Sequence, residues 1–162
     1  MGETGPGGGL VFLISGGLTY EMAPKAWGIN ETTVIQWCSD QTHSVATGDA
    51  VGTGSANTTS MLTSAPATSF VACTASAPNA VRAYAGGGLT DWFLPSQDEL
   101  NAMYTYSLVG GFNSATYGFA GGDYWSSSQI NASRAWYQNV VIGSQIDGLK
   151  NFALRVRPVR AF

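Results

Sequence analysis

The chain has 162 residues, of which 44% are hydrophobic, 12% aromatic and 10% charged, with a formal net charge of −3. This length is typical of one domain, and the aromatic content argues against a wholly disordered chain. The negative charge argues against a nucleic-acid partner held by phosphate neutralisation. Since no apolar run approaches the roughly 18 residues that cross a bilayer, we expect no membrane insertion.

The N-terminal part of the chain predicts short extended segments. Residues 1–9 contain a Gly-Pro-Gly-Gly-Gly run and are interpreted as the end of a linker or the start of the domain, which occupies 10–162. Residues 10–14 predict a buried strand because they are continuously apolar. Irregular structure is expected over 15–33, and a short strand or packed extended segment over 34–37.

Helices are expected at three places in the middle of the chain. Residues 52–64 and 76–85 are rich enough in Ala, Met and Leu to suggest short helices. A third helix begins after Ser96, which forms a capping box with Glu99. Apolar residues follow this box at helical spacing, so the helix has one apolar face.

The C-terminal part of the chain predicts a loop followed by strands. Residues 107–123 are rich in Gly, Ser, Asn and Thr and are expected to form the loop. Strands are expected over 124–128, 134–142 and 151–159. A few helices followed by a run of antiparallel strands is typical of a mixed α+β domain.

Charge is distributed unevenly along the chain. Residues 1–100 contain two basic and eight acidic residues, whereas residues 101–162 contain five basic and two acidic residues. The C-terminal third is therefore expected to have a different surface from the rest. Its arginines at 155, 157 and 160 alternate, and we expect them to brace the sheet through acidic partners. The expected partners are Asp91, Asp98 or Asp123.

Motifs for catalysis and metal binding are weak. The single histidine, His43, and the two cysteines, Cys38 and Cys73, cannot make a four-ligand zinc site without carboxylates. The glycine runs lack the Gly-Lys-Ser/Thr of a phosphate-binding loop. We therefore expect no catalytic residues, no cofactor and no metal. The cysteines allow one disulfide, and two buried free thiols are the equal alternative.

Aromatic and serine residues of the C-terminal half have structural interpretations. We expect Trp92, Phe93, Trp125 and Trp136 in the core, where aromatic burial supplies much of the stability. The serines at 126–128 are expected to satisfy buried backbone groups or to allow close packing of strands.

Several of these stretches resemble one known family. They are residues 2–9 with Val11-Phe12, residues 91–100, 124–128, 135–138 and 155–162. Together they resemble the Legionella collagen-like protein C-terminal domain family, of the C-type lectin fold, over about residues 2–162. The resemblance implies an α+β domain with two short helices and a twisted antiparallel sheet. It also implies ligand display, meaning adhesion or receptor binding by a phage tail or a cell-surface protein, and an extracellular, cell-surface or virion location.

The last stretch also resembles the variable region of proteins diversified by diversity-generating retroelements, which share that fold. The corresponding variable region here is 124–162. Such diversification acts at template adenines, so an asparagine codon of the form AAC can become a codon for many other residues. The candidate ligand-binding residues, each reachable from such a codon, are Ile130, Ala132, Ser133, Arg134, Tyr137, Val141, Ile142, Ser144, Ile146, Asp147, Gly148, Leu149, Phe152, Ala153 and Leu154.

Two interpretations of this region stay open. In the first, Asn131, Asn139 and Asn151 are unmutated copies within a diversified surface. In the second, the region is an ordinary fixed strand pair whose apolar residues face a core or a partner chain. If the apolar residues are exposed, they form a patch beside a tyrosine and an arginine, a composition that marks interaction sites. A protein or peptide ligand then fits better than a bare sugar.

Two alternative functions are weighed against ligand display by a variable surface. One is a fixed glycan-binding adhesin head, a homotrimer on a collagen-like or fibrous stalk, that recognises a sulfated polysaccharide through arginines 155, 157 and 160. The calcium-dependent sugar motifs Glu-Pro-Asn and Gln-Pro-Asp are absent. The other is an enzyme, since formylglycine-generating oxidases share the broad fold. The cysteines Cys38 and Cys73 lie outside the C-terminal third where such an oxidase has its reactive pair, so we expect no enzyme.

Overall fold

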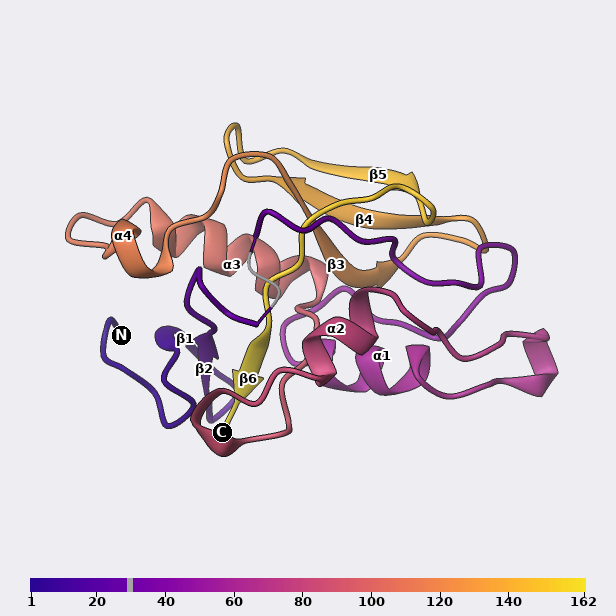
Figure 1. Ribbon diagram of the computed structural model, residues 1–162, viewed down its shortest axis with the longest axis horizontal. Helices are drawn as coiled ribbons and strands as arrows, with labels where there is room; N and C mark the ends of the chain where they lie inside the picture. Colours follow the sequence, from indigo (N-terminus) through magenta and orange to yellow (C-terminus); the bar gives the residue numbers. More distant parts are fainter. Residues whose placement is uncertain (29–30) are drawn as a thin grey trace.

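Two small antiparallel sheets form the framework of the computed structural model, which describes residues 1–28 and 31–162 (Figure 1). The first sheet has the order β1-β2-β6 and consists of β1 (Leu10–Ser15), β2 (Leu18–Met22) and β6 (Val159–Ala161). The second has the order β3-β4-β5 and consists of β3 (Asp123–Gln129), β4 (Arg134–Asn139) and β5 (Gln145–Leu149). The chain therefore returns to its first sheet only at its C-terminal end.

Within the described residues, four short α-helices accompany the sheets. They are α1 (Gly54–Met61), α2 (Ala77–Arg82), α3 (Gln97–Ser107) and α4 (Ser114–Tyr117), with 3-10 turns at Pro66–Thr68 and Gly86–Gly88. Helix α3 lies between the sheets, because Leu100 and Met103 pack with Phe12 of β1 and Tyr124 of β3 in one buried cluster (Figure 1). Helices α1 and α2 contribute to a second cluster that contains Trp37, Trp92 and Trp125.

The α+β class expected from the sequence is confirmed, and so are several local elements. Strand β1 starts at the apolar run, and α1 and α2 lie inside the ranges expected for them. Ser96 caps α3 as expected: its Oγ accepts from the Glu99 backbone N–H at 3.2 Å, and the Glu99 carboxylate accepts from the Ser96 N–H at 2.8 Å. Ile35 pairs with Leu154 in an isolated bridge, so 34–37 is a packed extended segment.

Four expectations about the strands and loops are wrong. Strand β2 and helix α4 occupy ranges expected to be irregular, and β4 ends at Asn139 instead of continuing to residue 142. The expected strand over 151–159 does not form. The segment instead stays extended and crosses the second sheet at the edge formed by β3. It pairs with that edge in one parallel bridge, Tyr124 with Arg155, before β6 begins at Val159. Residues 156–159 are all buried, Arg157 included, so the alternation of valine and arginine there does not mark one buried face of a strand.

Most of the expected aromatic core is confirmed. Trp92, Phe93 and Trp125 are buried, but Trp136 is only partly buried. It lies on β4 between Ala135 and Tyr137, which pack against the tryptophan-rich cluster, and so it projects from the opposite face of the strand.

The serines of β3 satisfy buried polar groups, as expected. The Ser126 hydroxyl donates to the Trp136 carbonyl at 2.9 Å, and the Ser128 hydroxyl donates to the Gly48 carbonyl at 2.9 Å. Ser127 Oγ accepts from Asn57 Nδ2 of α1 at 3.0 Å. These bonds compensate for a register shift in the β3–β4 pairing between Trp125 and Gln129.

Two arginines of the C-terminal segment, Arg157 and Arg160, brace the fold through carboxylates, as expected, although two of the acids are unexpected. The third, Arg155, donates to the Glu31 backbone carbonyl instead. Arg160 pairs with Asp91 at 2.6 Å and with the buried Glu21 at 3.2 Å. Arg157 is fully buried and forms an ion pair with Glu31. Its guanidinium also donates to the carbonyls of Ala23, Tyr117 and Gly118 at 3.0–3.1 Å.

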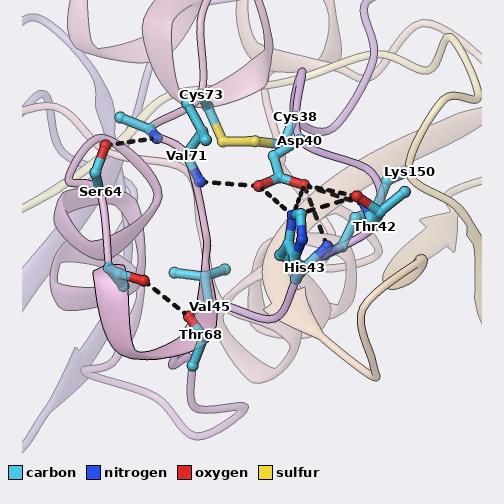
Figure 2. A network of polar contacts seen from close by, with 12 residues as sticks. Cys38, Asp40, Thr42, His43, Val45, Ser64, Thr68, Val71, Cys73 and Lys150 are labelled. Atoms are coloured by element: carbon cyan, nitrogen blue, oxygen red, sulfur yellow. Dashed lines mark hydrogen bonds and ion pairs between the residues drawn. A yellow bond between two sulfur atoms is a disulfide. The ribbon is translucent and has the colours of Figure 1, made fainter.

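A disulfide joins Cys38 and Cys73, whose Cα atoms are 5.0 Å apart, so the choice between a bridge and two thiols is settled for the bridge. The Asp40 carboxylate strengthens the same junction, because it accepts from the backbone N–H of Val71 at 2.8 Å and from those of Thr42 and His43 at 3.1 Å (Figure 2). Burial alone raises the pKa of Asp40, but these hydrogen bonds outweigh it and hold the pKa at about 2.

Removing the disulfide should lower the free energy of unfolding. The bridge closes a loop with a sequence separation of 35 residues, for which the chain-entropy model gives about 3–4 kcal/mol. Urea denaturation of the Cys38→Ala/Cys73→Ala double variant should show this loss relative to the oxidised wild type. Reduced wild type should match the double variant. Equal stability of all three forms would contradict a disulfide in the native protein.

Truncating Arg157 should destabilise the fold strongly, because Glu31 would be left buried without its counter-ion. We expect Arg157→Met to lower the free energy of unfolding by about 3–5 kcal/mol in urea denaturation. The control is Arg82→Met, which removes a partly exposed arginine at the end of α2. A loss for Arg157→Met no larger than that of the control would show that the ion pair contributes little.

Asp40 should make stability depend on acid pH. Its folded-state pKa of about 2 lies below the ordinary 3.8, so the ionised carboxylate stabilises the fold above about pH 4. This contribution is lost as the pH falls from about 4 towards 2. Urea denaturation across that range should therefore show the stability gap between wild type and Asp40→Asn shrinking with acid. The exposed Asp49→Asn variant is the control, and a constant gap for Asp40→Asn would contradict the role.

Candidate functional site

The candidate residues gather on the β4–β5 hairpin, on the turn that precedes it and on residues 150–154 that follow it. The hairpin lies at the outer edge of the second sheet (Figure 1). Its exposed large apolar side chains, with their exposed fractions, are Ile130 40%, Val141 67%, Ile142 68%, Ile146 38%, Leu149 38% and Phe152 45%. We call this set the hairpin surface. The apolar residues of this region therefore face solvent.

Two of the candidate residues do not offer a free side chain. Gly148 is buried, and a Cβ there would lie 3.0 Å from the Tyr137 ring and 3.1 Å from the Phe152 ring. It therefore allows the two rings to approach, and it presents no exposed side chain to a ligand. Leu154 is half-buried and pairs with Ile35, so it supports the hairpin surface from its inner side.

Strand register divides the hairpin surface between two sides of the sheet. Tyr137 pairs with Ile146 and Arg134 pairs with Leu149, and paired residues of antiparallel strands project to the same side. Tyr137 packs edge-on against the buried Trp125, with 5.9 Å between ring centroids. On the other side, Arg134 forms an ion pair with Asp147. The candidate residues are therefore not one flat patch but two sides of one projecting ribbon.

Asparagine side chains hold both turns of this region. Asn131 Oδ1 accepts from the backbone N–H groups of Ser133 and Arg134 at 3.0 Å. Asn139 Oδ1 accepts from those of Val141 and Ile142 at 3.0 and 3.2 Å. Such bonds are a reason for asparagine at a turn. The interpretation of Asn131 and Asn139 as unmutated copies overlooks this role.

Helix α3 fixes the hairpin from below through side-chain amides. Gln145 Nε2 donates to the Gln97 carbonyl at 2.9 Å, and Gln138 Nε2 donates to Asn101 Oδ1 at 2.9 Å. The hairpin turn also approaches α3 closely, since a Cβ on Gly143 would lie 2.7 Å from the Tyr104 ring. Sequence reasoning missed these supports because nothing local links the helix to the hairpin.

The positive charge of the C-terminal third does not form a basic surface. Lys150 is buried, and its Nζ donates to the His43 carbonyl at 3.1 Å and to Gln129 Oε1 at 2.7 Å. It also lies 4.8 Å from the centre of the Trp37 ring. Burial lowers the pKa of Lys150 to about 8, although the charge of Asp40 acts in the opposite direction. Arg157 is buried too. Much of the positive charge of the C-terminal third therefore lies inside the protein and does not reach its surface.

A hollow of about 520 Å³, lined by residues that include Pro24, Ala26 and Ala115, lies away from the β4–β5 hairpin. Another, of about 400 Å³, is lined by residues that include Asp40 and His43. A hollow of only about 70 Å³ lies beside Leu149. The hairpin surface is thus a projecting surface, whose shape suits a macromolecule more than a small molecule.

The described part of the chain, residues 1–28 and 31–162, has neither a metal-binding cluster nor a membrane-spanning helix. That part of the chain brings together no group of three or more His, Cys, Asp or Glu side chains that could hold a metal ion. It also contains no helix that is long and apolar enough to cross a membrane.

Comparison with known proteins identifies the family of this fold. The model of the Lcl C-terminal domain matches residues 29–160, which include the whole second sheet and the hairpin surface. No curated protein matches the chain. The family match covers most of the chain and agrees with the resemblance seen in stretches such as residues 91–100 and 124–128. The chain therefore belongs to the Lcl C-terminal domain family.

Proposed function

We propose that this domain binds a protein ligand or receptor through the hairpin surface. The observation that carries the proposal is a set of large apolar side chains held in solvent on a braced hairpin. Exposing Val141 and Ile142 at 67% and 68% is unfavourable unless a partner covers them. The hydrogen bonds from Gln138 and Gln145 of the hairpin to α3 reduce the ordering cost of binding, because they already hold the hairpin in place.

The same arrangement supports diversification by a retroelement. The candidate positions other than Gly148 reach solvent at least in part, whereas the fixed-looking serines and Trp125 beneath them are buried. Substitution at the hairpin surface would thus change the ligand while the supporting layer keeps the fold. A rigid scaffold with variable exposed positions is the general design of recognition loops.

An extracellular, cell-surface or virion location is part of the proposal. The Cys38–Cys73 disulfide supports it, since disulfides persist in oxidising compartments. In this proposal the domain acts by binding and not by catalysis. A homotrimeric arrangement, as on a stalk, stays a prediction.

Recognition of a sulfated polysaccharide by a fixed adhesin is the less favoured alternative. It depends on free guanidinium groups, but Arg157 is buried against Glu31 and Arg160 is held by Asp91 and Glu21. Arg155 is partly buried, and its Nε donates to the Glu31 carbonyl at 2.8 Å. An anion would have to compete with these contacts.

Charge placed on the hairpin surface should weaken ligand binding. Binding is measured on a panel of immobilised cell-surface proteins, and we expect Ile142→Asp/Ile146→Asp to weaken it by about tenfold or more. The reason is that each isoleucine buried by the ligand contributes about 1.5–3 kcal/mol. The matched control is Ile14→Asp, which changes an isoleucine of 60% exposure on β1. A sulfated-glycan panel tested in parallel decides the alternative. Glycan binding that survives the double variant and disappears in Arg155→Ala would overturn the proposal.

A further inference from the structure

Strand β5 forms an uncovered edge of the second sheet. The opposite edge, β3, is covered by the crossing segment, because Trp125 N–H donates to the Arg155 carbonyl at 2.9 Å and Arg155 N–H donates to the Asp123 carbonyl at 3.0 Å. β5 pairs with β4 on one side only. In Figure 1 it lies on the outside of the molecule.

The hydrogen bonds that flank the hairpin ladder show which residues of β5 face outward. Lys150 N–H donates to the Ser133 carbonyl, and Asn139 N–H donates to the Ser144 carbonyl, both at 2.9 Å. In an antiparallel pair these bonds alternate, so residues 146 and 148 direct their backbone groups at β4. Residues 145, 147 and 149 direct theirs away from the sheet.

Most of these outward groups have no partner in the part of the chain described. The Leu149 carbonyl accepts from Phe152 N–H at 2.9 Å, and the Asp147 carbonyl accepts from Arg134 Nη2 at 3.2 Å. Among residues 1–28 and 31–162, no hydrogen bond engages the backbone N–H of Gln145, Asp147 or Leu149. Three donors at alternate residues, about 7 Å apart along the strand, match the repeat of one more extended backbone.

Protein edges of this kind usually carry a feature that discourages pairing, such as lysine or proline. β5 has the sequence QIDGL and contains neither. Its one charged side chain, Asp147, is already engaged by Arg134 in an ion pair. Exposed Ile146 and Phe152 border the edge on one side of the sheet, and Leu149 borders it on the other. The edge is thus both unpaired and flanked by apolar side chains.

We propose that an extended peptide segment of the protein ligand adds to β5 as a further strand. Its backbone would accept from the free N–H groups of 145, 147 and 149, and its alternate side chains would cover Ile146 and Leu149 on the two sides. This inference rests on the proposed function and specifies the mode of binding. It also explains why the hairpin surface occupies both sides of one ribbon instead of one flat patch.

A second copy of this chain is a less suitable occupant. Symmetric pairing of two β5 strands about Asp147 would place the two Asp147 residues directly opposite each other, an arrangement of like charges that destabilises a ladder. A foreign peptide has no such restriction on the residue opposite Asp147. We therefore assign the edge to a peptide segment of another protein.

Backbone methylation of a bound peptide tests strand addition directly. Peptides are selected from a random dodecapeptide display library on the wild-type protein and kept if Ile142→Asp/Ile146→Asp abolishes binding while Ile14→Asp does not. Each is then synthesised with a single N-methyl group at successive positions. We expect about fivefold or greater loss of affinity at every second residue, where the methyl group lies between the peptide and the β5 backbone and keeps them apart. Little loss is expected between these positions, where the amide points away from β5. Amide hydrogen exchange should slow at Asp147 and Gln145 when the peptide binds.

Three results would overturn strand addition. Peptides that depend on the hairpin surface but tolerate N-methylation at every position would leave the proposed function intact and reject this mode. Failure to select any peptide that depends on the hairpin surface would reject a peptide segment as the occupant, while the protein panel tests the proposed function independently. Concentration-dependent dimerisation that protects the Asp147 and Gln145 amides without peptide would assign the edge to a second copy.

Discussion

The rest of this fold depends most on the buried ion pair between the Arg157 guanidinium and Glu31. The guanidinium joins the loop after β2, the Tyr117–Gly118 end of α4 and Glu31, all far from it in the sequence. Tyr124 of β3 donates to the same Glu31 carboxylate at 2.6 Å, so one ion pair links the irregular N-terminal segment to the second sheet. Partners on every side of the guanidinium satisfy its donors, which makes burial of the charge tolerable.

The domain relies on buried polar contacts to hold segments that have no regular secondary structure. Its long loops, which lack regular hydrogen-bonded ladders, are held by buried charges and side-chain amides. Glu21 shows the same pattern, because its carboxylate accepts from Gly7 and Gly9 N–H groups and from Arg160. Polar networks of this type specify one geometry, since each unpaired member would cost more than an apolar neighbour would.

The hairpin surface benefits from this rigidity. Its side chains are exposed, yet the backbone beneath them is fixed by Gln97 and Asn101 of α3 and by the Tyr137–Trp125 contact. Substitutions at Ile142 or Ile146 would therefore change the ligand that is bound with little effect on the stability of the fold. This separation of a binding layer from a supporting layer is what a recognition surface requires, whether its residues vary between copies or stay fixed.

Sequence alone determined the features that depend on neighbouring residues. The capping box of α3, the apolar strand β1, the α+β class and the family all follow from short stretches such as residues 91–100. The sequence pattern misled where alternation of apolar and polar residues fits more than one structure. It predicted a strand over 151–159 that does not form, and it gave no prediction of β5.

Only the tertiary structure decided that Cys38 meets Cys73, that Lys150 and Arg157 are buried, and that the candidate residues divide between two sides of a ribbon with a free edge. The physical reason is distance along the chain. Arg157 and Glu31 are 126 residues apart, and no local pattern records a pairing at that separation. Strand register has the same character, because a shift of one residue would move every side chain of β5 to the other side of the sheet.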